Sequence, residues 1–73
     1  MVITLYDFMH MSETDQYEIV WKGTFLGDRH DNGLWIQCYS LGSFYVELFY
    51  DQQANQVQRL RPFTRVEQLA PYL

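Results

Sequence analysis

The sequence has few of the features that stabilise a small protein in addition to its hydrophobic core or that anchor it in a membrane. It contains one cysteine, Cys38, so no disulfide can form within the chain, and a lone cysteine without secretory features indicates a reducing compartment. No run approaches the roughly 20 apolar residues of a membrane helix. The first residues have neither the basic charge nor the cleavage site of a signal peptide. We therefore expect a cytoplasmic protein that forms one domain, residues 1–73, and has no membrane partner.

Basic residues are also scarce. Five Lys and Arg stand against nine Asp and Glu, which gives a net charge of −4. Nucleic-acid binding depends on cations that neutralise phosphates, so this balance argues against a nucleic-acid partner. A chain of 73 residues also buries a small core, and domains of this size often gain stability by oligomerising. The aromatic content, 18%, is high, and aromatic residues are enriched at protein interfaces.

The first third of the chain predicts one helix. Residues 2–6 are apolar enough for a short extended strand, which we expect to precede it. Ser12 is a suitable N-cap, acidic residues follow in the first turn, and Gly23 is a natural stop, so the helix should cover residues 13–22. Its apolar residues recur at helical spacing and should face the core: Tyr17, Val20 and Trp21.

After Thr24 the pattern changes to strands joined by tight turns. Asn32-Gly33 is a strong hairpin signal, and Gly42-Ser43 suits a type II′ turn. A three-residue loop then follows the third strand, and Pro62 marks the fourth strand as an edge because proline cannot donate to a ladder. Thr64 with Glu67 forms a capping box for a short C-terminal helix. The expected fold class is α+β, with an N-terminal helix, a four-stranded antiparallel β-meander and a short C-terminal helix; a curved, barrel-like sheet is the alternative.

The turns set the register, and the register assigns side chains to two faces of the sheet. Tyr39 should pair with Val46, and Glu47 with Arg61. One face should then form the core under the helix: Trp35, Tyr39, Leu41, Phe44, Val46, Leu48 and Leu60. The opposite face mixes large apolar side chains with charges. We expect its residues to bind a partner: Ile36, Tyr45, Glu47, Phe49, Arg59, Arg61 and Phe63.

Several segments resemble a known group of proteins. These are Phe44–Asp51, the residues Asn55, Val57, Arg59–Arg61 and Phe63, the closing stretch Leu69–Leu73, and Trp21–Arg29. Together they resemble short uncharacterised single-domain proteins of Bacteroides-type bacteria. The resemblance implies a free-standing bacterial domain, and it transfers no functional site.

Residue types that are common in catalytic and metal sites are present, but their positions in the sequence do not favour such a site. Cys38 lies within a predicted strand, away from any helix N-terminus, so a nucleophilic site with His10 or His30 is not favoured. Asp28, His30 and Asp31 cluster near the first hairpin without a spacing typical of metal ligands. We expect a non-enzymatic protein without a metal or other cofactor.

Three classes of function remain open. The first is a protein-binding or assembly module, most simply a homodimer, that uses the mixed aromatic and charged sheet face. The second is an acidic inhibitor, antitoxin or immunity-type protein whose clustered acidic residues, such as Asp28, Asp31 and Glu47, neutralise a basic partner. The third is a small enzyme or ligand-binding protein, which requires a concave pocket.

Two alternative hypotheses would give the mixed sheet face a different role. An RNA-stacking face beside Arg59 and Arg61 is disfavoured by the acidic balance and by Glu47 between the arginines. The C-terminal helix, through Val66 and Leu69, could instead fold over this face and bury it within one chain.

Overall fold

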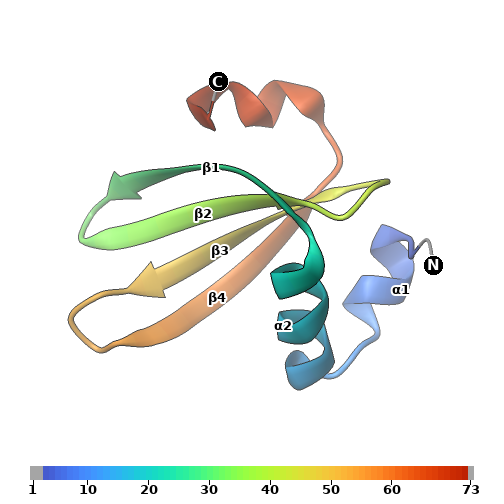
Figure 1. Cartoon of the computed structure of the whole chain (residues 1–73), viewed down its shortest axis with the longest axis horizontal. Helices are drawn as coiled ribbons and strands as arrows, with labels where there is room; N and C mark the ends of the chain where they lie inside the picture. The colour runs from blue at the N-terminus through green and yellow to red at the C-terminus, as the bar shows by residue number, and fades with distance from the viewer. Residues whose placement is uncertain (1–2, 73) are drawn as a thin grey trace.

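The computed structural model describes residues 3–72 and confirms the α+β class. Within these residues the elements, in chain order, are α1 (Leu5–Met9), α2 (Glu13–Lys22), β1 (Thr24–Asp31), β2 (Leu34–Ser40), β3 (Tyr45–Asp51), β4 (Gln56–Phe63) and the 3₁₀ helix η1 (Val66–Tyr72). The strands form an antiparallel meander in the order β1-β2-β3-β4. Figure 1 shows α1 and α2 on one side of the sheet and η1 on the other.

The N-terminal segment is helical where a strand was expected, so that expectation is wrong. Thr4 caps α1 because its hydroxyl accepts a hydrogen bond from the Asp7 backbone N–H at 3.1 Å. The Asp7 carboxylate accepts one in return from the Thr4 N–H, also at 3.1 Å. This reciprocal capping satisfies two backbone donors that a short isolated strand would leave to water. Val2, the first residue of the expected strand, lies outside the described residues.

Helix α2 occupies residues 13–22 as expected, but it buries a narrower stripe. Ser12 caps its first turn and Gly23 follows its last residue. A β-carbon at Gly23 would stand 2.9 Å from the Ser40 carbonyl oxygen, so the close approach of α2 to β2 requires glycine here. Val20 is fully buried, whereas Trp21 is 55% exposed and was wrongly expected in the core.

The turn residues have the conformations that the sequence predicts. Asn32 and Gly33 both have positive φ, 52° and 80°, and Asn55 has φ of 55° in the loop before β4. Gly42 has φ of 101°. The expected register is found, because Tyr39 pairs with Val46 and Glu47 pairs with Arg61. The loop before β4 has four residues, 52–55, where three were expected, and a bulge in β4 restores the register at Glu47. The chemistry of the turns therefore determines which side chains share a face of the sheet.

Each edge strand contains a β-bulge. In β1 the pairing jumps across Leu26, from Phe25 to Gly27. In β4 it jumps across Gln58, and the same strand contains Pro62, which confirms its expected position at an edge. The bulges increase the twist of both edges and leave one residue in each without a partner in the ladder.

The sheet separates two apolar clusters. The main core lies under α1 and α2 and is formed by Ile3, Phe8, Val20, Tyr39, Phe44, Val46 and Leu48. A smaller cluster lies under η1 and is formed by Cys38, Phe63 and Leu69. Trp35 was expected in the core but is only half-buried, because it lies near the β1–β2 turn, where its ring packs between His30 and Tyr50.

The register can be tested at Val46, which has no exposed surface. We expect Val46→Asp to abolish cooperative unfolding, because an unpaired buried carboxylate costs several kcal/mol and a small domain has little stability to lose. Val66→Asp is the matched control, since Val66 is 61% exposed. Circular dichroism during urea titration distinguishes the two variants, and a cooperatively folded Val46→Asp protein would refute the assignment of faces.

Candidate functional site

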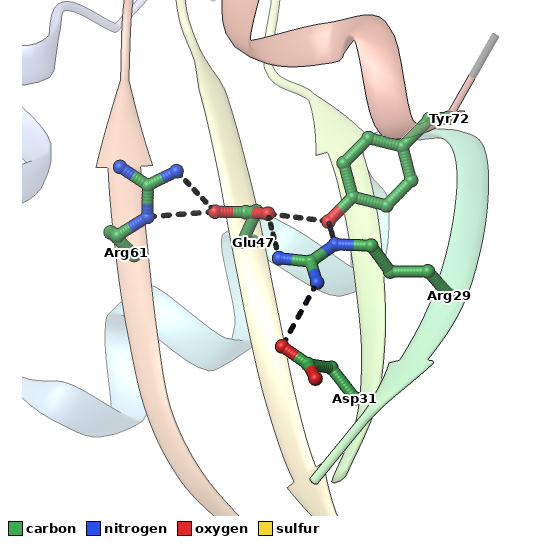
Figure 2. Close-up of polar contacts among 5 residues, drawn as sticks. All are labelled: Arg29, Asp31, Glu47, Arg61 and Tyr72. Carbon is green, nitrogen blue, oxygen red and sulfur yellow. Dashed lines mark hydrogen bonds and ion pairs between the residues drawn. The ribbon is translucent and has the colours of Figure 1, made fainter.

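The sheet face beneath η1 is centred on a buried carboxylate. Glu47 of β3 is 2% exposed. Arg61 donates from Nε to Glu47 Oε1 at 2.7 Å, Arg29 Nη2 lies 3.4 Å from Oε2, and the Tyr72 hydroxyl donates to Oε2. Figure 2 shows Glu47 with Arg61 on one side and Arg29 and Tyr72 on the other. Four elements, β1, β3, β4 and η1, thus converge on one side chain.

Small residues make room for this arrangement. Gly27, Cys38, Glu47 and Arg61 form one cross-strand row through all four strands. A β-carbon at Gly27 would stand 3.2 Å from both the β-carbon and the carbonyl oxygen of Tyr72. The absent side chain at Gly27 therefore lets η1 approach the sheet closely enough for the Tyr72 hydroxyl to reach Glu47.

The electrostatics of the cluster favour an ionised Glu47. Burial on its own raises the pKa of the Glu47 carboxyl, but the hydrogen bonds from Tyr72 and Arg61 outweigh it, so the pKa lies below its usual value. Burial and the hydrogen bond to Glu47 raise the pKa of the Tyr72 hydroxyl, which therefore stays protonated. Arg29 also lies 3.6 Å from Asp31. The donors and acceptors in this cluster thus pair with one another, an arrangement that fixes structure and leaves no group poised for proton transfer.

Cys38 has the properties of a packing residue. It is fully buried beneath η1, and burial followed by the nearby Glu47 charge raises the pKa of its thiol to about 11. A thiol in this state is protonated at neutral pH and is a poor nucleophile. His30 lies in a different row of the sheet from Cys38 and stacks on Trp35 on the helix-covered face.

The seven residues expected to bind a partner fall into two groups. Phe49 illustrates the covered group, because it is 5% exposed and Arg59 lies over its ring at 4.0 Å from the centroid. The covered residues are Ile36, Glu47, Phe49 and Phe63. The accessible ones are Tyr45 and Arg61, both half-buried, and Arg59, which is exposed. Leu69 of η1 provides part of the cover, whereas Val66 points away and is 61% exposed. A role for the seven in partner binding remains a prediction.

Another apolar surface lies where α2 meets β1. Trp21, Phe25 and Leu26 are 55%, 53% and 40% exposed, and we call these three residues the edge patch. The rings of Trp21 and Phe25 both pack edge-on against Tyr39, with centroids at 6.2 Å and 5.6 Å. Sequence periodicity missed this surface because it assigned Trp21 to the buried stripe, and no sequence pattern reveals the bulge at Leu26.

The acidic residues near the first hairpin do not converge. Asp28 accepts a hydrogen bond from Trp35 Nε1 at 2.6 Å on the helix-covered side of the sheet. Asp31 pairs with Arg29 on the other side, and Glu47 is buried. Among residues 3–72 no three His, Cys, Asp or Glu side chains are placed to hold a metal ion. The clustered acidic surface expected for a neutralising inhibitor is likewise not formed by these three residues.

A hollow lies beside the end of α2, but its chemistry is simple. Its volume is about 410 Å³. Its lining is mostly apolar side chains and backbone, with Lys22 as the charged group: Ile3, Ile19, Lys22, Gly23, Thr24, Ser40, Leu41 and Gly42. Among the described residues, its lining holds the hydroxyls of Thr24 and Ser40 besides Lys22, and contains no His, Cys, Asp or Glu.

Comparison with protein-family models, with curated proteins and with solved structures finds no match to this chain. In the part of the chain that the structure describes, no helix is long and apolar enough to cross a membrane. The fold and the cluster define an α+β protein in which an ion-pair network joins strands of the sheet around Glu47, and a hydrogen bond from Tyr72 links the C-terminal 3₁₀ helix to it.

Glu47→Gln tests the role of this network. We expect it to lower the free energy of unfolding at pH 7 by about 1–3 kcal/mol, below the usual cost of breaking a fully buried pair because both arginines are about a third exposed. Glu67→Gln should cost at most about 0.5 kcal/mol, since its ion pair with Arg65 is exposed.

The effect of Glu47→Gln on the free energy of unfolding should also depend on pH. The pKa of Glu47 is lower in the folded state than in the unfolded state, so its stabilisation is complete above its ordinary pKa and is lost as pH falls through the folded value. The difference between wild type and Glu47→Gln should therefore shrink in acid. Urea titrations from pH 7 down to pH 3 measure it, and a constant difference would contradict a depressed pKa.

Proposed function

We propose that this protein is a non-catalytic binding and assembly module that forms a homodimer through the edge patch. The observation that supports the proposal is the exposure of three large apolar side chains, Trp21 near the end of α2 and Phe25 and Leu26 on the edge strand β1. Contiguous exposed apolar surface of this kind usually marks an interaction site.

The grouping of the patch distinguishes it from ordinary surface. Tyr6, Met9 and Val66 are also exposed, but they lie on α1 and η1, and single apolar residues on a surface are normal. In the edge patch, Trp21 and Phe25 share Tyr39 as a common support, which holds both rings in place. Rigid aromatic side chains are the residues that most often dominate binding at an interface.

A second copy of the chain is the partner that fits this surface most simply. An isologous interface requires a patch that is complementary to itself, and an apolar aromatic patch meets that condition whereas a patch of one charge sign does not. The outer edge of β1 has no strand partner within the described residues, so a second chain can approach there. A domain of 73 residues with a small core also gains stability from association.

The remaining properties suit a protein of the bacterial cytoplasm. A single buried thiol is compatible with a reducing compartment. The alternative function, an acidic inhibitor or immunity-type protein, has less support, because Asp28 and Asp31 face opposite sides of the sheet and Glu47 already has two arginine partners.

Phe25→Glu tests the dimer. We expect it to weaken self-association by about tenfold or more, since loss of an aromatic anchor and burial of a charge both oppose assembly. Tyr6→Glu is the matched control, because Tyr6 is a 71% exposed aromatic residue on α1. Sedimentation equilibrium over a range of concentrations gives the association constants.

The outcomes separate the possible partners. A dimer that is unaffected by Phe25→Glu would place the interface elsewhere. A wild-type protein that stays monomeric at its highest soluble concentration would refute the homodimer. If that monomer captured another protein from its native extract, and Phe25→Glu abolished the capture, the edge patch would instead bind a different chain.

A further inference from the structure

Helix η1 packs on the sheet through one buried and one half-buried side chain. Leu69 is the residue of η1 that is buried, and it packs against Cys38 and Phe63 in a cluster that is separate from the main core. Tyr72 adds its hydrogen bond to Glu47, a 3.4 Å hydrogen bond that its hydroxyl accepts from Arg29 Nε, and its close approach to Gly27. The exposed residues of η1 are Val66, Glu67, Gln68, Ala70 and Pro71. A 3₁₀ helix of seven residues is also long for its type, so it has little intrinsic stability of its own.

The charge beneath η1 does not depend on η1 for compensation. Glu47 has ion pairs with Arg29 of β1 and Arg61 of β4, and both arginines belong to the sheet. If η1 left, the carboxylate would lose the Tyr72 hydrogen bond but would keep both counter-ions, and water could replace the hydroxyl. Departure of η1 therefore avoids the large penalty of a buried unpaired charge.

The main core is also independent of η1. Its residues lie on the other face of the sheet and are covered by α1 and α2 (Figure 1). Segments with few buried apolar contacts open locally at lower free energy than the core. The two-sided construction therefore allows one side to open while the other stays folded.

We propose that η1 is a strap that opens as a unit while α1, α2 and the sheet remain folded. Opening exposes Cys38 and Phe63 and uncovers more of Tyr45, whose ring packs at 5.4 Å from that of Phe63. It also exposes the Glu47–Arg61 pair. Two of the seven residues that the sequence predicts as partner-binding, Glu47 and Phe63, thus become accessible in the open state, and Tyr45 and Arg61 become more exposed, so η1 controls access to that face. This proposal does not depend on the edge patch.

Cys38 provides a built-in reporter, because it is the one cysteine of the chain and is fully buried under η1. The experiment measures the rate at which Ellman's reagent labels Cys38 in the full chain, scaled to the rate in the urea-unfolded chain. Local opening predicts labelling that is faster than global unfolding permits and nearly independent of urea at low concentrations. Labelling that follows the global unfolding equilibrium at every urea concentration would overturn the proposal.

Two leucine variants separate local from global opening. Leu69→Ala removes the buried anchor of the strap, and Leu60→Ala removes a side chain packed against the main core. The Leu69 contact is lost both on local opening and on global unfolding, so we expect Leu69→Ala to accelerate labelling by the same factor by which it raises the global unfolding constant. The Leu60 contact persists when η1 opens, so Leu60→Ala should raise the global unfolding constant and leave the labelling rate at low urea nearly unchanged. Equal scaling for both variants would show that η1 and the core unfold together.

Tyr72→Phe provides a second test of the proposal if Leu69→Ala fails to fold. It retains the ring beside Gly27 and removes the hydroxyl that donates to Glu47. We expect this variant to increase the labelling rate of Cys38 several-fold, while Arg29 and Arg61 remain paired to Glu47. An unchanged rate, together with urea-dependent labelling, would show that Tyr72 does not hold the strap closed.

Discussion

The buried carboxylate of Glu47 is the interaction on which the arrangement of this protein depends. It lies in β3, but its hydrogen-bond partners come from β1, β4 and η1. The most distant partner, Tyr72, is 25 residues away from Glu47 in the sequence. A slip of one residue in β3 would turn Glu47 into the apolar core and leave Arg29 and Arg61 without their shared acceptor. The cost of an unpaired buried charge thus reinforces the register that the turns establish.

The fold could be predicted from short-range chemistry, and the surfaces could not. Asn32-Gly33, Gly42 and Asn55 adopt the backbone conformations that their types favour, so the meander and the Glu47–Arg61 pair follow from sequence. The contribution of Tyr72 depends on the missing side chain of Gly27, a contact between residues far apart in the chain. The exposure of Trp21 depends on how α2 lies across the sheet, which helical periodicity does not specify. Helix α1 was missed because its capping pair, Thr4 and Asp7, follows an apolar start that favours a strand.

The two faces of the sheet are covered in different ways. The helix-covered face buries aliphatic and aromatic side chains and supplies most of the hydrophobic stabilisation. The face under η1 is shielded by a thin layer, in which Arg59 covers Phe49, Arg61 lies near Phe63, and Leu69 fills the remaining space. The guanidinium groups of these arginines lie over apolar rings, so a chain this short can close a second face without a second layer of long helices.

The bulges at Leu26 and Gln58 have a consequence for the way copies of this chain can join. A fibre grows when each new strand finds an unbroken row of backbone donors and acceptors along an exposed edge. Here both rows are interrupted, in β1 by Leu26 and in β4 by Gln58 and by Pro62, which has no N–H to offer. Side chains such as Trp21 and Phe25 can still meet those of another molecule, but both edges are poor templates for backbone pairing between copies. The chain therefore presents aromatic surface beside a sheet edge that disfavours the strand-to-strand growth of a fibre.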